Sequence, residues 1–327
     1  MCLLPILTLA ATGITLPLVA WILLRRAESV PRHRPQTALY HDRQGARPPG
    51  PGIPRQIWTY WHDADRPALI EACIGNWRRL NPDFRITVVC RDALHQYVAE
   101  QDLPSGFYQL MPQRQSDWLR LYLLNRHGGI WLDASIVLTR SLDWMIEAHA
   151  HSQADYVGFF LDIYTRRSEH PIIENWCMAA APGSPFIGHW LRELTDSALS
   201  IGESAYLQVL ARRGVRDEVL QGIEMPEYLI MHVAAQVLLW EAPDTYRLCL
   251  TRAEDSAFFY HDHSRWKWRR LFLRMLLRTA PDVPPALIKL RGKERRKMEF
   301  YIRHRLFRST SLVGRYLVSL GREATEP

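Results

Sequence analysis

The segment from Gln113 to Asp133 constrains the fold more than any other stretch of this chain. We expect a helix from Gln113 to Arg126, followed by a glycine pair at Gly128 and Gly129. Helices commonly end at such a glycine, because glycine adopts positive φ without a steric cost. The next three residues, Ile-Trp-Leu, are apolar and lead directly to the carboxylate of Asp133. The pattern predicts a helix, a tight reversal and a short buried strand with a carboxylate at its C-terminal end.

A strand–helix–strand order precedes this segment. Residues 56–61, Gln-Ile-Trp-Thr-Tyr-Trp, are β-branched or aromatic for the most part and predict a strand. Apolar residues then recur at helical spacing from Leu69 to Leu80, Asn-Pro-Asp at 81–83 ends that helix, and residues 85–90 predict a second strand. This order is the start of a parallel, helix-covered sheet, an α/β fold. Ligands of open α/β sheets bind at the carboxyl ends of the strands, so Asp133 is expected to face a ligand.

The charged residues of this segment suit the transfer of a sugar from a nucleotide donor. Asp117 and Arg120 share one helix face, and the glycine pair brings that face beside Asp133. Such a transfer must neutralise a leaving diphosphate, which a carboxylate-bound cation does, and must hold the sugar hydroxyls. We therefore expect Asp117, Arg120 and Asp133 to be catalytic. The simpler alternative is a surface i,i+3 salt bridge followed by an ordinary turn Asp.

The string from 116 to 135, S-D-W-L-R-L-Y-L-L-N-R-H-G-G-I-W-L-D-A-S, resembles the signature of the capsular polysaccharide synthesis glycosyltransferases. It is more distantly similar to the DXD-containing mannosyltransferases of yeast and to the glucosyltransferase domains of large clostridial toxins. Residues 53–61, 174–180 and 226–232 also look like segments of the family, so the resemblance covers roughly residues 53 to 267. It implies a GT-A-like, Rossmann-type nucleotide-sugar-binding domain and a metal-dependent, mostly retaining transfer with Mn²⁺ or Mg²⁺.

The resemblance also implies roles for individual residues. Asp117 and Arg120 would contact the donor sugar, and Asp133 would lie near the ribose and the metal. A full DXD motif would place an acidic residue at 135, but this chain has Ser135, which is a weaker cation ligand. The remaining metal ligands are expected at His261 and Ser264, with His263 as the rival of His261. The expected substrate contacts are Trp58, Trp61, Gly128, Gly129, Asn175, Glu227, His232 and Trp266.

The N-terminal residues predict a membrane anchor. Residues 2–24 contain no charged side chain, and these 23 residues exceed the length that spans a bilayer. Basic residues follow the apolar run, which favours an uncleaved anchor over a signal peptide or a buried helix and places the rest of the chain in the cytoplasm. We expect a transmembrane helix at 1–26, a Pro- and Arg-rich linker at 27–52, and a single-pass protein of the cell inner membrane.

The C-terminal part is strongly basic. Between Arg265 and Arg308 there are 15 Lys or Arg and 3 Asp or Glu, a local charge of +12 in a chain with a net charge of +7. Arginines, aromatics and aliphatics alternate at helical spacing from Trp266 to Arg278, which is typical of a helix in a membrane interface. We expect a glycosyltransferase domain at 53–268 and a basic amphipathic helical tail at 269–327. Nucleic-acid binding is the competing interpretation, and the predicted anchor favours the membrane.

The predicted function is the transfer of a hexose from a UDP- or GDP-sugar to a surface or capsular polysaccharide or a glycolipid. The competing hypothesis is a catalytically silent membrane scaffold of a polysaccharide assembly complex with the same fold, and Ser135 is the residue that supports it. The five cysteines are scattered without a Cys-x-x-Cys pair, which argues against a disulfide framework or a thiolate zinc site.

Overall fold

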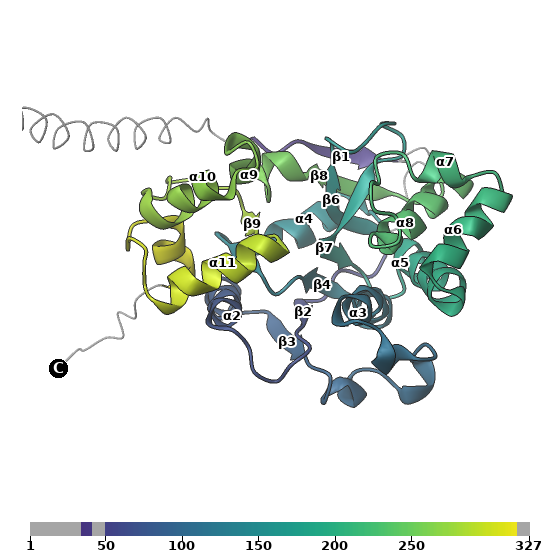
Figure 1. Ribbon diagram of the computed structural model, residues 1–327, viewed down its shortest axis with the longest axis horizontal. Coiled ribbons are helices and arrows are strands. Elements are labelled where there is room, and N and C mark those ends of the chain that lie inside the picture. The colour runs from purple at the N-terminus through teal and green to yellow at the C-terminus, as the bar shows by residue number, and fades with distance from the viewer. Residues whose placement is uncertain (1–33, 41–49, 319–327) are drawn as a thin grey trace, which may run out of the picture.

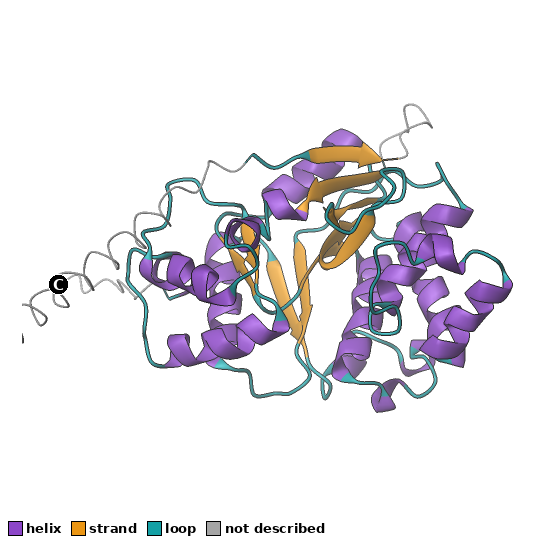
Figure 2. Ribbon diagram, turned by 45° about the horizontal axis from the view of Figure 1, so that its top comes forward, coloured by secondary structure: helices purple, strands orange, loops and turns teal. Residues whose placement is uncertain are grey.

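The central strands bury both of their faces, and this builds a sheet with helices on each side. In β4 (Gly129–Leu132), Ile130 and Leu132 belong to one apolar core and Trp131 belongs to the other. Successive side chains of a strand point to opposite faces, so a strand without polar residues is covered twice. The computed structural model describes residues 34–40 and 50–318, and Figure 2 shows the strands between two groups of helices.

Seven strands form the main sheet in the order β1-β8-β6-β7-β4-β2-β3, and β5 and β9 form a small second sheet. β2 is parallel to β3 and to β4, β6 is parallel to β8, and the remaining pairs are antiparallel. The strands not yet given bounds are β1 (Thr37–Tyr40), β2 (Gln56–Tyr60), β3 (Arg85–Val89), β5 (Ile136–Leu138), β6 (Tyr156–Leu161), β7 (Ile172–Ala180), β8 (Leu248–Arg252) and β9 (Leu287–Lys289).

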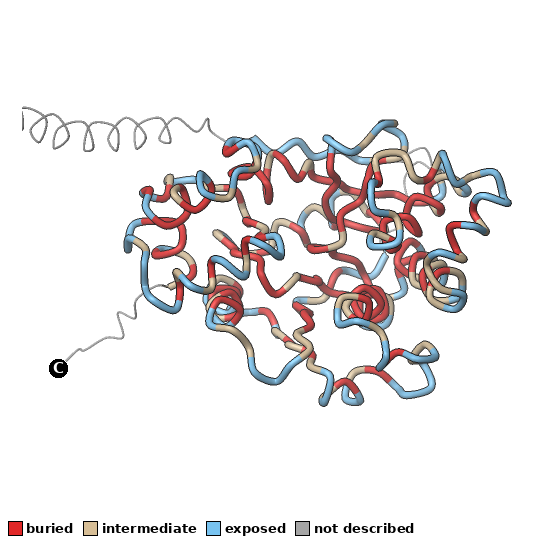
Figure 3. Tube along the Cα trace, viewed as in Figure 1, coloured by how far each residue is buried: buried red, intermediate tan, exposed pale blue. Residues whose placement is uncertain are grey.

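The helices divide between the two faces of the sheet (Figure 1). One core is covered by α2 (Ala68–Leu80), α4 (Asp143–Ser152), α9 (Phe259–His263), α10 (Trp268–Phe272) and α11 (Gly292–Arg303). The other is covered by α3 (Pro112–His127), α5 (Pro185–Arg192), α6 (Glu203–Arg212), α7 (Arg216–Val219) and α8 (Ile230–Glu241). In Figure 3 the buried residues follow the central strands and α3, so the predicted helix of the 113–133 segment lies in the middle of the fold.

The elements predicted around this segment are confirmed. β2, α2, β3, α3 and β4 lie within one or two residues of their predicted bounds. The sheet is mixed rather than parallel, because the chain after β4 passes through β5, α4 and β6 before β7 joins β4 in the antiparallel direction.

The predicted membrane architecture needs correction. The expected transmembrane helix at 1–26 lies outside the described residues, and within 34–40 and 50–318 no helix has the length and apolarity needed to span a bilayer. The prediction of a single-pass protein of the inner membrane is therefore not upheld. The predicted linker at 27–52 is also corrected in part, because its residues Thr37–Tyr40 form β1 and pair antiparallel with β8.

The predicted basic tail is part of the globular fold. β9 pairs with β5, with Lys289 opposite Ile136. Leu271, Met275 and Met298 are at most 1% exposed and belong to the same apolar core as α2. The apolar side chains that suggested a membrane-surface helix are thus the ones that cover this core, and the boundary predicted after residue 268 cuts through the fold.

Candidate active site

The glycine pair sets the angle between α3 and β4. Gly128 ends α3 with a φ of 65°, and Gly129 begins β4 with a φ of 106°. A Cβ on Gly128 would lie 2.6 Å from Cδ of Pro182, and one on Gly129 would lie 2.6 Å from the carbonyl oxygen of Gln56. Trp58 Nε1 donates a hydrogen bond to the Gly128 carbonyl at 2.9 Å. Trp58 and the two glycines lie outside the cavity described below, so their predicted substrate contacts are corrected to a structural role.

The reversal places two carboxylates around one guanidinium. Asp117 and Arg120 are almost completely buried, and their Oδ1 and Nη2 atoms are 3.2 Å apart. Nη2 of Arg120 also lies 3.6 Å from Asp133 Oδ1, and Nη1 donates to the carbonyl oxygen of Asn175 at 2.6 Å. Arg114 Nη1 binds the other oxygen of Asp117 at 2.8 Å. The three residues predicted to be catalytic therefore form one connected network of charges, at the carboxyl end of β4.

Asp133 has a second cationic partner. Lys289 Nζ, at the end of β9, lies 2.5 Å from its Oδ2, and Trp131 Nε1 donates to Oδ1 at 3.1 Å. Burial would raise the pKa of Asp133, but the charges of Lys289 and Arg120 outweigh it and hold this pKa below its ordinary value. Asp133 is thus a carboxylate at neutral pH, and both of its oxygens already have partners.

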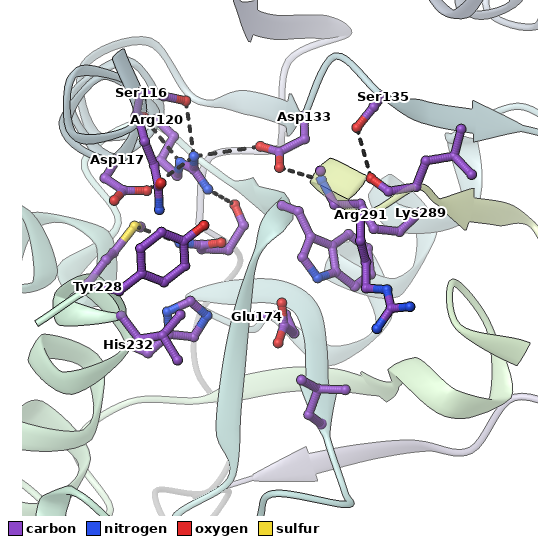
Figure 4. Close-up of a pocket in the computed structure, with 18 of the residues that line it drawn as sticks. Ser116, Asp117, Arg120, Asp133, Ser135, Glu174, Tyr228, His232, Lys289 and Arg291 are labelled. Atoms are coloured by element: carbon purple, nitrogen blue, oxygen red, sulfur yellow. Dashed lines mark hydrogen bonds and ion pairs between the residues drawn. The ribbon is translucent and has the colours of Figure 1, made fainter. Parts of the chain in front are cut away.

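A cavity of about 890 Å³ opens at this edge of the sheet. Its size is within the usual range for sites of small organic ligands and cofactors. The cavity is bounded by the end of β2, the start of α3, the end of β4, the start of β7, the segment 222–232 and the segment 289–295. Figure 4 shows Asp133 between Arg120 on one side and Lys289 on the other, with Glu174, Tyr228 and His232 across the cavity. The predicted site residues that line it are Trp61, Asp117, Arg120, Asp133, Ser135, Asn175, His232 and Trp266.

His232 is held neutral at the cavity wall. Burial first, and then the charges of Arg120 and Arg114, lower its pKa from 6.5 to about 4. Its Nδ1 has no hydrogen-bond partner among the described residues. A neutral imidazole with a free ring nitrogen can donate to or accept from a hydroxyl group of a ligand.

Three other predicted residues lie away from the cavity. The carboxylate of Glu227 accepts a hydrogen bond from Ser204 on the surface, at 2.5 Å. Ser264 is buried next to α9. His261 is 1% exposed, and its Nε2 lies 2.8 Å from Oε2 of the equally buried Glu294. His263, the rival of His261, is exposed and bonds to the carbonyl oxygen of its own helix. The Glu294 partner of His261, and the position of both residues outside the cavity, therefore correct the metal-ligand predictions for His261 and Ser264.

The residues around Asp133 do not fit the divalent cation that the resemblance implies. Asp133 Oδ2 is bonded to an ammonium group, and the Ser135 hydroxyl donates to the Leu290 carbonyl at 3.1 Å. Within 34–40 and 50–318 no three His, Cys, Asp or Glu side chains are grouped so as to hold a metal ion. Mn²⁺ and Mg²⁺ prefer several oxygen ligands, and a cation beside Lys289 would also be repelled by it.

Several residues that line the cavity were not predicted from the sequence. Glu174 lies on β7, and burial raises its pKa from 4.5 to about 7 although Lys289 opposes this shift. A carboxylate within the largely apolar run Ile-Ile-Glu-Asn-Trp-Cys was the signal that could have identified it. Lys289, Arg291 and Arg295 also line the cavity. They belong to the basic block. The sequence shows the charge of this block, but it does not show that the block returns to the sheet.

Comparison with known proteins confirms the resemblance to the capsular polysaccharide synthesis protein family, whose model matches residues 39–196. This range contains α3, the glycine pair and Asp133. The O-glycosyltransferase braB of Annulohypoxylon truncatum is 29% identical over 167 residues, which are 45% of this chain and 39% of that protein. The glycosyltransferase afumC of Aspergillus fumigatus is 27% identical over 182 residues, 50% of this chain and 46% of that protein. The chain thus spans less than half the length of either relative.

Solved structures with similar arrangements are also glycosyltransferases by name. The PaToxG glycosyltransferase has a TM-score of 0.34 and 16% identity, over 92% of this chain and 96% of that one. The UDP-bound glycosyltransferase domain of the YGT toxin has a TM-score of 0.38 and 10% identity, over 84% of this chain and 96% of that one.

Proposed function

We propose that this chain is a glycosyltransferase that transfers a hexose from a nucleotide-activated donor, a UDP- or GDP-sugar, to a surface or capsular polysaccharide or a glycolipid. The observation that carries the proposal is the network of Asp117, Arg120 and Asp133 in the wall of a large cavity, within the segment that the family model matches. The names of the curated relatives support the same class of enzyme.

The proposed reaction moves one glycosyl group between two oxygens. The bond between the anomeric carbon and the diphosphate oxygen breaks, and its electron pair remains on the diphosphate. The oxygen of an acceptor hydroxyl bonds to the anomeric carbon, and the hydroxyl proton passes to an oxygen of the departing diphosphate. We propose that this transfer retains the anomeric configuration.

Each side chain of the network has a task that its position supports. Arg120 is fixed by Asp117, Asp133 and the Asn175 carbonyl, so it is oriented before a ligand arrives. Such preorganisation is what makes a charged group effective in a transition state. Asp117 and Arg120 would hold the hydroxyls of the donor sugar, and Asp133 would lie at the ribose.

The wall of the cavity opposite Asp133 could bind an acceptor or the outer face of the donor sugar. Neutral His232 and the exposed ring of Tyr228 offer hydrogen-bonding groups and apolar surface, as sugars require. Trp61 and Trp266 line the cavity near the basic segment 289–295, where a nucleobase could stack.

Thermal unfolding with a panel of UDP- and GDP-sugars tests the proposal. A ligand present at 100 times its Kd stabilises the folded state by about 2.7 kcal/mol, or roughly 4 °C in Tm for a chain of this size. We expect at least one donor to raise the Tm of the wild type by this amount and to have a much smaller effect on Arg120→Ala. If no nucleotide sugar raises the Tm, the proposed function is wrong.

A further inference from the structure

We infer that a cluster of basic side chains, Lys289, Arg291 and Arg295, holds the donor diphosphate in place of a divalent cation. This inference rests on the proposed function and specifies how its leaving group is bound. It follows from the lack of fit between Asp133 and a metal ion, and from where the basic block of the sequence lies in the fold.

The ammonium group of Lys289 occupies the place beside Asp133 where a bridging cation is expected. Lys289 Nζ is 2.5 Å from Asp133 Oδ2, and the lysine side chain is only 12% exposed. The backbone holds it there: Lys289 is opposite Ile136 in the β5–β9 ladder, and Leu290 N donates to the Ser135 carbonyl at 3.3 Å. The position of Lys289 is therefore set by the sheet and not by a chance rotamer of a surface lysine.

The two arginines extend the positive charge along the same wall of the cavity. The Arg291 guanidinium lies over the Trp266 ring, 5.1 Å from its centroid, and Arg295 lies over the Trp61 ring at the same distance. Stacking on an aromatic face fixes the plane of a guanidinium. Nε and Nη2 of Arg291 are bonded to Glu294, so its Nη1 is the group that it offers to a ligand. Within the described residues Arg295 forms no ion pair with a carboxylate, and burial lowers its pKa. Such a desolvated cation gains the most from an incoming anion.

This arrangement meets the electrostatic demand of the proposed transfer with protein groups alone. The departing diphosphate gains negative charge as the glycosyl bond breaks, and guanidinium and ammonium groups bind phosphate oxygens with charge-assisted hydrogen bonds. Arg120 and Lys289 lie on opposite sides of Asp133, so the sugar and the diphosphate would be held next to each other (Figure 4).

Calorimetric titration of the whole chain with UDP and with GDP, once in EDTA and once in Mn²⁺, tests the inference. We expect the better nucleotide to bind in EDTA with a Kd within about twofold of its value in Mn²⁺. Lys289→Met should weaken this binding at least about tenfold, which is 1.4 kcal/mol. The loss should be smaller for the corresponding monophosphate, because one phosphate fewer meets the cluster. A merely structural role of Lys289 would weaken both nucleotides equally.

Lys293→Met is the matched control, because Lys293 is exposed on α11, outside the cavity and four residues from Lys289. Arg295→Gln provides a second cluster variant if Lys289→Met folds poorly, and it should weaken diphosphate binding in the same direction. Binding that requires Mn²⁺ and is unaffected by Lys289→Met would overturn the inference and leave the proposed function standing. If neither diphosphate binds in EDTA or in Mn²⁺, the proposed function fails, and the inference fails with it.

Discussion

Arg120 shows why local sequence was informative about the centre of the site. Its partner Asp117 is three residues away on the same helix, and Asp133 follows after one reversal. Short-range geometry of this kind is fixed by helix periodicity and by a glycine turn, so it can be predicted from the sequence. Lys289 could not be predicted in this way, because it meets Asp133 across 156 residues of chain.

Glu174 gives a prediction about stability and pH. Its pKa is raised from 4.5 to about 7, mainly by burial, so the folded protein holds a proton there that the unfolded chain has already released. The free energy of unfolding therefore falls as the pH rises from 4.5 to 7, in total by about 3 kcal/mol for this group. Glu174→Gln removes the ionisation. Denaturant unfolding should show that the free energy of unfolding of the variant, relative to that of the wild type, increases by this amount between pH 4.5 and a pH of about 8.

The same substitution at an acidic residue on the surface should not produce this pH-dependent increase in the free energy of unfolding. Glu71→Gln is a suitable comparison, because Glu71 is an exposed residue of α2. A constant difference between Glu174→Gln and the wild type at all pH values would show that Glu174 has the same pKa in the folded and the unfolded chain.

The turn between α3 and β4 depends on a backbone conformation that only glycine adopts easily. Gly129 has a φ of 106°, and a Cβ there would lie 2.6 Å from a carbonyl oxygen of β2. We expect Gly129→Ala to lower the free energy of unfolding by more than about 1 kcal/mol, because the change adds both strain and a steric clash. Gly75→Ala is the control: Gly75 lies in α2, and a Cβ there meets nothing within 4 Å. It should be neutral or stabilising by up to about 1 kcal/mol. Equal effects of the two changes would contradict this role of Gly129.

The contact between α9 and α11 gives His261 a partner within the protein, where the resemblance implies a metal ligand. The hydrogen bonds from His261 and Arg291 lower the pKa of Glu294 to about 2 against the opposing effect of burial. This stabilisation is complete above pH 4.5 and is lost as the pH falls towards 2. A sequence cannot distinguish a histidine that is hydrogen-bonded to a buried carboxylate from a metal ligand when the partner is 33 residues away.

His261→Ala tests whether this residue acts in stability or in ligand binding. Removing the hydrogen bond to a buried carboxylate should lower the free energy of unfolding by about 2 kcal/mol, as measured with denaturant. His263→Ala, which changes an exposed histidine of the same helix, should have little effect. The Kd of nucleotide diphosphates should be the same for His261→Ala and the wild type, with or without Mn²⁺. Unchanged stability together with a loss of Mn²⁺-dependent binding would restore His261 as a metal ligand.

In the whole molecule, the basic block between Arg265 and Arg308 has a different role from the one that the sequence predicts. The density of charged and apolar residues after Trp266 predicts a membrane-surface helix. The same residues complete both the apolar core and the cavity, because β9 returns to the sheet beside β5. Hydrophobic periodicity shows that a helix has an apolar face, but it does not show what covers that face.

Removal of residues 269–327 should therefore abolish folding and not merely release a tail. The deletion removes Leu271, Met275, Ile288, Met298 and Val313, all at most 1% exposed. Their burial contributes about 10 kcal/mol in total, which is comparable to the net stability of a typical domain. Calorimetry should find no cooperative unfolding transition for the truncated chain. A cooperative transition near the wild-type Tm would show that the domain does end near residue 268.

The most direct test of the proposed function is the release of nucleoside diphosphate from UDP- and GDP-sugars. We predict release by the wild type from at least one donor, and at least about tenfold slower release by Asp117→Asn, Arg120→Ala and Asp133→Asn. This corresponds to about 1.4 kcal/mol of transition-state stabilisation for each residue. Asp143→Asn, a change at an exposed residue outside the cavity, should match the wild type. Wild-type rates in all three site variants, or no release from any donor, would contradict the assignment of this site.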